Sequence, residues 1–246
     1  MAVSRLRLVF DSTPHDALTQ VASGPALLSA LDGDGDLVRL YQPPPTLAFS
    51  GKDCAGTGIA AAAEAARAHG FVPVRRGPGG RAAAYHRGSL VIDHVGTDAY
   101  AEPISARFAR FGAFYRGVLR GLGVPAEVGE VPGEFCPGEY SVNDGAGHKV
   151  VGTAQRITKA GWLFSAIVLV RDPEPLREVL IDVYAALRLD WDPSTVGTLD
   201  GSAPGLTVTA VGEAVIAGYR RDFDVSVIDP PVSAPDPERF RVPGAG

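Results

Sequence analysis

Two side chains in one short segment have the types that acyl-transfer chemistry needs. Residues 134–156, EFCPGEYSVNDGAGHKVVGTAQR, set Cys136 in a Pro-Gly loop and place Lys149 among small and β-branched residues. A thiolate is a good acyl acceptor, and a nearby positive charge lowers the pKa of a cysteine. The segment therefore predicts a nucleophilic cysteine supported by a lysine. The other interpretation is a small buried cysteine and an exposed strand lysine.

The two groups meet only if the chain bends between them. A regular hairpin across the turn DGAG sets Cys136 opposite Gln155 and ~20 Å from Lys149, at ~3.3 Å per residue. Pro137 and Gly138 supply a bend that permits the loop to return. A lysine facing a cavity here also needs an anion as partner, because an unpaired buried charge is costly.

A second segment has the composition of an anion-binding loop. Residues 74–90, VRRGPGGRAAAYHRGSL, combine glycines, which let a ligand approach the backbone closely, with Arg75, Arg76, Arg81 and Arg87. The Walker pattern is absent, and so is the dinucleotide Gly-x-Gly-x-x-Gly. A glycine-rich turn flanked by solvated arginines is the alternative interpretation.

Composition excludes several classes of partner. The formal net charge of −5 argues against nucleic acid, because phosphate binding requires clustered Lys and Arg. No apolar run approaches the ~20 residues that cross a bilayer, and the start MAVSRLRLVF lacks the apolar core of a signal peptide. We therefore expect a cytoplasmic protein with no membrane contact and with reduced cysteines. His86 has no ligand partner at metal-site spacing, so no metal site is expected.

The periodicity of the chain predicts the elements that hold these segments. Phe108, Phe111, Tyr115 and Leu119 form an apolar stripe that predicts a helix from about 104 to 122. One or two helices are expected within 12–31, where Gly24-Pro25 breaks the pattern, and further helices within 56–70, 172–189 and 205–224. Strands are expected at 5–10, 37–42, 43–51, 71–76, 81–86, 89–95, 139–143, 148–158 and 162–170.

These elements predict one mixed α/β domain over residues 1–230, built on a largely antiparallel sheet flanked by helices. A proline-rich, loosely ordered tail is expected at 231–246.

Read together, RRGPGGRAAAYHRGSL and GHKVVGTAQR resemble the two signature segments of the lipoate/octanoate branch of the biotin and lipoate protein ligase family. The resemblance covers roughly residues 35–195 and implies a fold like that of class II aminoacyl-tRNA synthetases and biotin protein ligases. In that family the arginine-glycine loop wraps the acyl chain or acyl-adenylate, and the lysine binds its carbonyl. The substrate-binding residues that the resemblance implies are Arg75, Arg76, Gly79, Gly80, His86, Gly88, Gly152, Thr153 and Gln155.

The stretch FCPGEYSVN is similar to the Cys-Pro-Gly loop of octanoyl amidotransferases, in which the cysteine carries the acyl chain as a thioester. This implies transfer of an octanoyl or lipoyl group to a lysine of a carrier protein, with Cys136 and Lys149 catalytic and no cofactor required. The implied partners are lipoyl-domain proteins or the glycine-cleavage H protein, with acyl carrier protein as a further candidate.

Two alternatives stay open. The first is an ATP-dependent lipoate-protein ligase that uses ATP and Mg with lipoate or octanoate as substrate. Ligases of this family usually carry the motif Gly-Gly-Gly-Ala-Val-Phe-His. Against this alternative, Arg81 stands at the third glycine of that motif and His86 stands one position late. We also expect no accessory domain after the matched region. The second alternative is a non-catalytic module that binds an acyl group or a carrier. The acyl donor and the preference between octanoyl and lipoyl groups stay open in all three.

Overall fold

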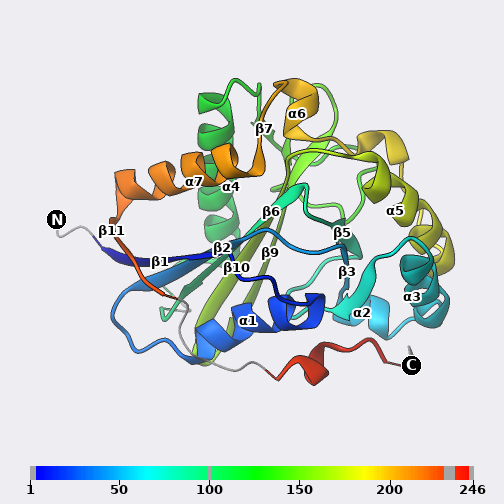
Figure 1. Ribbon diagram of the computed structural model, residues 1–246, viewed down its shortest axis with the longest axis horizontal. Helices are drawn as coiled ribbons and strands as arrows, with labels where there is room; N and C mark the ends of the chain where they lie inside the picture. Colours follow the sequence, from blue (N-terminus) through cyan, green and yellow to red (C-terminus); the bar gives the residue numbers. More distant parts are fainter. Residues whose placement is uncertain (1–3, 99–100, 230–235, 244–246) are drawn as a thin grey trace.

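The computed structural model describes residues 4–98, 101–229 and 236–243, and a large mixed β-sheet forms its centre (Figure 1). In the described part of the chain this sheet has eight strands, in the order β11 (Asp224–Val227), β1 (Arg5–Asp11), β2 (Asp36–Tyr41), β6 (Ser89–Gly96), β10 (Gly161–Leu169), β9 (Lys149–Thr158), β8 (Val142–Asn143) and β7 (Glu127–Val128). The first three strands are parallel, and every later pair is antiparallel. The predicted largely antiparallel sheet is confirmed.

A smaller sheet stands beside the large one. Within the described residues it has three strands, in the order β4 (Val72–Arg75), β3 (Thr46–Phe49) and β5 (Ala83–Tyr85). The chain leaves the large sheet after Tyr41 because prolines 43–45 cannot donate hydrogen bonds to a ladder. This second sheet carries the arginine-glycine segment.

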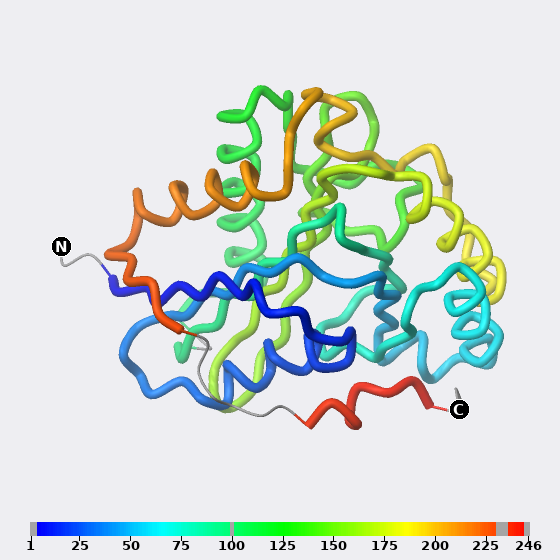
Figure 2. The backbone as a smooth tube through the Cα atoms, viewed as in Figure 1, coloured from blue at the N-terminus to red at the C-terminus, as the bar shows by residue number. Residues whose placement is uncertain are grey.

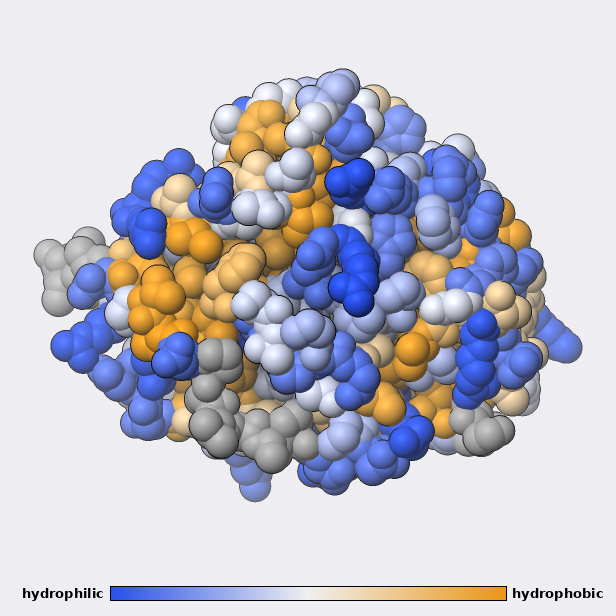
Figure 3. Space-filling view, in the orientation of Figure 1, coloured by the Kyte–Doolittle hydropathy of each residue, from blue (hydrophilic) through white to orange (hydrophobic). Residues whose placement is uncertain are grey.

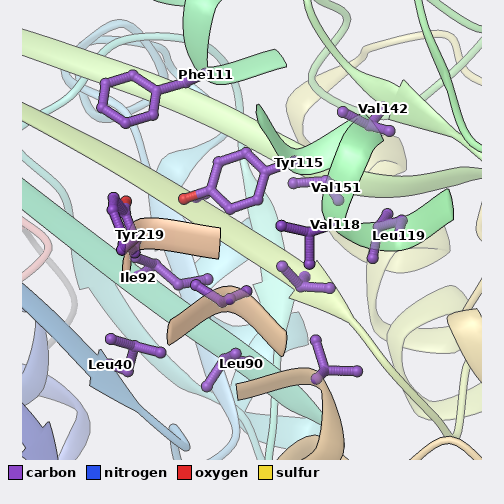
Figure 4. Packing of buried hydrophobic residues seen from close by; sticks show 14 of the residues in the cluster. Leu40, Leu90, Ile92, Phe111, Tyr115, Val118, Leu119, Val142, Val151 and Tyr219 are labelled. Atoms are coloured by element: carbon purple, nitrogen blue, oxygen red, sulfur yellow. The ribbon is translucent and has the colours of Figure 1, made fainter. Parts of the chain in front are cut away.

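Helices cover both faces of the large sheet (Figure 1). On one face, α4 (Ile104–Gly121) and α7 (Val208–Asp222) pack on the sheet through a large hydrophobic cluster. Figure 4 shows part of this cluster, including Phe111, Tyr115, Leu90, Ile92 and Tyr219. The predicted apolar stripe of α4 is confirmed, since its central residues are buried in the core. Helices α3 (Ile59–Ala68) and α5 (Glu174–Leu187) enclose the smaller sheet in a second cluster.

Helix α1 (Ala17–Ser29) lies on the opposite face and is continuous through Pro25. Of the one or two helices that this segment predicts, the structure has one, and Gly24-Pro25 does not divide it. Gly24 instead allows close packing, because a Cβ atom there would lie 3.0 Å from Asp93 Oδ2. The helix begins at Asp16, whose side chain accepts a hydrogen bond from the Thr19 N–H. Packing on the sheet thus outweighs the hydrogen bond that the proline removes.

Part of the proline-rich tail is ordered against the domain. Residues 237–240 form a short 3₁₀ helix, η2 (Pro237–Phe240), that lies beside α1 (Figure 2). Val242 is buried in the cluster around the smaller sheet, and Arg241 forms a β-bridge with Val74. The expectation of a loosely ordered tail is wrong for residues 236–243, and its remaining residues lie outside those described.

Hydrophobic side chains are exposed on the face shown in Figure 3, around strands β1 and β11 and helix α7. Phe10 is 50% exposed and Val227 is 64% exposed. None of the helices in the described ranges combines the length and the apolar character that crossing a membrane requires.

Candidate active site

Cys136 lies in a loop that doubles back toward strand β9. The expected strand 139–143 is reduced to Val142–Asn143, so the residues before it form a loop instead. The φ angle of Cys136 is 44°, a left-handed conformation that residues other than glycine seldom adopt. Its N–H donates to the Tyr184 hydroxyl at 2.7 Å, and that hydroxyl donates to the Ala82 carbonyl at 2.9 Å. Helix α5 and the segment before β5 therefore fix this conformation.

The thiol is held by the arginine-glycine segment. Its Sγ accepts hydrogen bonds from the Arg81 N–H at 3.1 Å and from Arg76 Nη2 at 3.5 Å. The approach depends on Gly80, which has a φ of +98°. A Cβ atom at Gly80 would lie 2.8 Å from Sγ and 2.7 Å from Arg76 Nη2. The two segments that the sequence analysis selected thus meet at the sulfur atom.

The surroundings of Cys136 favour its thiolate form. Burial alone raises the pKa of the Cys136 thiol. The positive charges of Arg76 and Lys149, together with the Arg81 N–H, lower the pKa by more than burial raises it. The pKa of Cys136 therefore lies below the ordinary value for a cysteine, as expected of a nucleophile.

Lys149 is buried and secures the base of the same loop. Its Nζ donates to the carbonyl of Cys136 at 2.8 Å, to the carbonyl of Phe135 at 3.0 Å and to Glu134 Oε1 at 3.1 Å. An ammonium group has three donors, so these acceptors use all of them. Lys149 therefore holds the loop in place, and its positive charge stabilises the thiolate. A substrate carbonyl can bind Lys149 only by displacing one of these three acceptors.

Glu134 is the anion that the buried lysine requires. Its carboxylate is completely buried, and it also accepts hydrogen bonds from the Ser141 hydroxyl at 2.6 Å, the Gly138 N–H at 3.0 Å and the Val131 N–H at 3.2 Å. These bonds close the loop around Cys136 from both sides. The carboxylate thus binds both the lysine and the backbone that presents the thiol.

Cys136 lines both an inner cavity and an open depression at the surface, and a further cavity adjoins the inner one. The inner cavity, ≈ 40 Å³, has an apolar wall that includes Ala83, Phe135, Ile167 and Leu169. An adjoining cavity of ≈ 50 Å³ shares Ile167 with it and continues along strand β10. On the other side of the thiol, an open depression of ≈ 590 Å³ leads to the surface. The thiol therefore lies between an apolar interior and an accessible exterior.

The structure brings together most of the predicted site residues. Arg76 and Gly80 contact the thiol, and Gly152 and Thr153 line the inner cavity with Cys136 and Lys149. Gly79 and Gln155 line the outer depression.

Three predicted residues lie elsewhere. Arg75 lines a neighbouring groove, which it shares with Arg76. The Gly88 N–H donates a hydrogen bond to His86 Nδ1 at 2.8 Å, and His86 Nε2 lies 2.9 Å from the Asp172 carbonyl oxygen. Neither His86 nor Gly88 lines either cavity beside the thiol. These two residues take part in a turn that follows β5.

Three groups that hold the thiol were not among the predicted site residues: Glu134, Tyr184 and the Arg81 N–H. The role of Glu134 could have been predicted, since it is an acid two residues before the cysteine and a buried lysine needs an anionic partner. No local signal pointed to Tyr184, because it reaches the loop from a helix 48 residues away. Within residues 4–98, 101–229 and 236–243, no three His, Cys, Asp or Glu side chains are arranged to hold a metal ion.

Replacing Gly80 by alanine should impair the site. The new methyl group would overlap both Sγ and the Arg76 guanidinium, which forces the sulfur away from the Arg81 N–H. Loss of this hydrogen bond should raise the pKa of Cys136, and we expect its alkylation at neutral pH to slow about tenfold, the effect of one pKa unit on the thiolate fraction. The rate of alkylation of Cys136 by iodoacetamide measures this. Gly77→Ala is the control, because its Cβ makes only an ordinary 3.4 Å contact with Arg156, and equal rates in both variants would contradict the prediction.

Comparison with known proteins gives a consistent result. Residues 16–220 match the family model of the lipoyl protein ligase A/B catalytic domain. The octanoyl-[GcvH]:protein N-octanoyltransferase of Exiguobacterium sibiricum is 27% identical over 183 residues, which are 72% of this chain and 67% of that protein.

Solved structures share the fold at low identity. A putative lipoate protein ligase from T. acidophilum has a TM-score of 0.71 at 20% identity, over 93% of this chain and 88% of that one. A lipoate-protein ligase A bound with ATP has a TM-score of 0.72 at 22% identity, over 92% of this chain and 90% of that one. The expected ligase-like fold is confirmed.

Proposed function

Because the chain belongs to the lipoyl protein ligase A/B catalytic-domain family, we propose that it transfers an octanoyl or lipoyl group to a lysine of a carrier protein through a thioester on Cys136. Membership in this family, with an octanoyltransferase as a relative, makes the chain an enzyme that transfers lipoyl or octanoyl groups to protein. The observation that carries the proposed thioester is the contact of Sγ with the Arg81 N–H and Arg76, beside an apolar cavity.

In the first step the Cys136 thiolate attacks the carbonyl carbon of the donor. The S–C bond forms as the donor's leaving group departs and takes up a proton. Arg76 stands beside the thiol, where its guanidinium can bind the negative charge that develops on the carbonyl oxygen. Lys149 keeps the loop in place during this step.

The acyl chain is proposed to occupy the inner cavity together with the adjoining cavity along β10, because ≈ 40 Å³ alone has room for only about three water molecules. Ala83, Phe135, Ile167 and Leu169 offer it an apolar wall, and each buried CH₂ contributes about 0.8 kcal/mol to binding. This cavity starts at the thiol, so a chain that enters it brings its carboxyl carbon to Sγ.

The carrier is proposed to be a lipoyl-domain protein or the glycine-cleavage H protein. The relative from Exiguobacterium is named for transfer from octanoyl-GcvH to protein, which supports a protein on both sides of the reaction. Acyl carrier protein remains a candidate donor.

A second candidate, the ATP-dependent ligase, is favoured by a groove of ≈ 520 Å³ next to the site. Arg75, Arg76, Arg156 and Arg239 line it, so it has the charge to bind nucleotide phosphates. This function predicts pyrophosphate release with free lipoate and Mg-ATP.

One experiment separates the two. The wild-type protein is incubated with an octanoylated carrier in the absence of ATP, and its intact mass is measured before and after neutral hydroxylamine. We expect an adduct of one octanoyl group that hydroxylamine removes, as a thioester requires. Pyrophosphate release from lipoate and Mg-ATP, with no ATP-independent adduct, would establish the ligase instead.

A further inference from the structure

The thiol has a second access route that the acyl chain does not need. The open depression of ≈ 590 Å³ shares Cys136, Thr153 and Ala154 with the inner cavity. If the acyl chain fills the inner cavity, then the thioester carbonyl lies at this shared boundary. The second reactant must therefore approach through the depression.

The walls of the depression have the chemistry of a lysine binding site. Its apolar part includes Ile104, which is 54% exposed, and Phe108, whose ring stacks on Tyr140 at a centroid distance of 5.5 Å. Its lining residues, all of which the structure describes, include one acidic residue, Glu139, and no basic residue. A long aliphatic stem that ends in a cation fits this combination.

Glu139 is available for such a ligand. It is exposed, and it forms no hydrogen bond or ion pair with any residue in the described part of the chain. It follows Cys136 by three positions, on the loop that Glu134 and Lys149 hold in place. Its backbone position is thus tied to that of the thiol.

We propose that Glu139 is the residue that receives the acceptor lysine, binding its ammonium group and accepting its first proton. The inference rests on the proposed function, because it concerns the second half of that reaction. A lysine amine is protonated at neutral pH and has no lone pair for attack. Once one proton has moved to Glu139, Nζ attacks the thioester carbonyl, the N–C bond forms and the C–S bond breaks. The second proton goes to the departing Cys136 sulfur, and Glu139 releases the first to solvent.

The test separates the two half-reactions. Wild type, Glu139→Gln and Glu139→Asp are loaded from a small octanoyl thioester, whose thiolate leaving group needs no proton from Glu139, and each acyl-enzyme is then mixed with an apo lipoyl-domain acceptor. We expect Glu139→Gln to form the thioester at the wild-type rate and to transfer it about 100-fold more slowly, in the range for loss of a general base. Glu139→Asp should recover part of the transfer rate. Glu130→Gln is the matched control, since Glu130 is an exposed acid that lines neither cavity at the thiol.

Hydroxylamine distinguishes proton acceptance from a structural defect. It is a neutral amine nucleophile and needs no carboxylate, so it should cleave the thioester equally fast in wild type and Glu139→Gln. Wild-type transfer to the lipoyl domain by Glu139→Gln, or an equal loss of hydroxylamine cleavage, would overturn the assignment. Failure of the wild-type protein to form any thioester would instead refute the proposed function, and this inference with it.

Discussion

Replacing Cys136 by serine should remove acyl transfer and leave the fold intact. The serine hydroxyl fits the space of the thiol, but it does not ionise at neutral pH and so cannot use the charges of Arg76 and Lys149. We expect no covalent adduct by intact mass and a loss of transfer rate of about 10³-fold or more, as for removal of other enzymatic nucleophiles. An octanoyl adduct on the variant that hydroxylamine still removes would place the thioester on another cysteine, since an oxygen ester at position 136 resists neutral hydroxylamine.

The other cysteine provides the matched control. Cys54 lies in the short helix α2 (Gly51–Cys54), where burial raises the pKa of its thiol despite the charge of Arg75. Cys54→Ser should therefore keep the full transfer rate.

The two thiols should also differ in their pH dependence. Alkylation rises with pH because only the thiolate reacts, so Cys136 should reach half its maximal rate at a lower pH than an ordinary cysteine, and Cys54 at a higher pH. Coincident profiles would contradict the environments described for the two thiols.

The sequence predicted that Cys136 and Lys149 could meet, but it could not predict how. The local signal for a loop that returns toward Lys149 was the Pro137-Gly138 bend. A regular hairpin, which keeps Cys136 and Lys149 apart, remained the other option. The decisive contacts join distant parts of the chain. Glu134 pairs with Lys149, and Tyr184 of helix α5 binds the Cys136 N–H. The contact of Tyr184 depends on tertiary packing and leaves no local pattern, whereas the acid two residues before Cys136 was a local signal for the partner of Lys149.

The placement of His86 shows the limit of matching residues by type. The family motif made His86 a substrate-binding candidate although it stood one position late. Neighbouring residues of a strand point to opposite sides, so a shift of one position reverses the direction of a side chain. Tyr85, the last residue of β5, lines the cavity that adjoins the inner one, together with Arg76. The next residue, His86, instead contacts Gly88.

Replacing Lys149 by methionine should both destabilise the protein and weaken the nucleophile. The substitution leaves the Glu134 carboxylate buried without an ion partner and leaves two loop carbonyls without donors. Breaking a buried ion pair in this way costs about 3–5 kcal/mol of unfolding free energy. The lost positive charge also raises the pKa of Cys136, so its alkylation profile should move to higher pH. Urea unfolding and the pH dependence of alkylation measure the two effects.

A double variant separates the two roles of this lysine. In Lys149→Met/Glu134→Gln no charge remains unpaired, so part of the lost stability should return, because the two substitutions remove the same interaction. The alkylation profile should stay at high pH, since no cation has been restored near the sulfur. Lys159→Met, in the exposed turn between β9 and β10, is the control and should alter neither measurement. If the double variant recovered stability and wild-type thiol reactivity together, then Lys149 would act on Cys136 through the loop alone, and its charge would have no part in the chemistry.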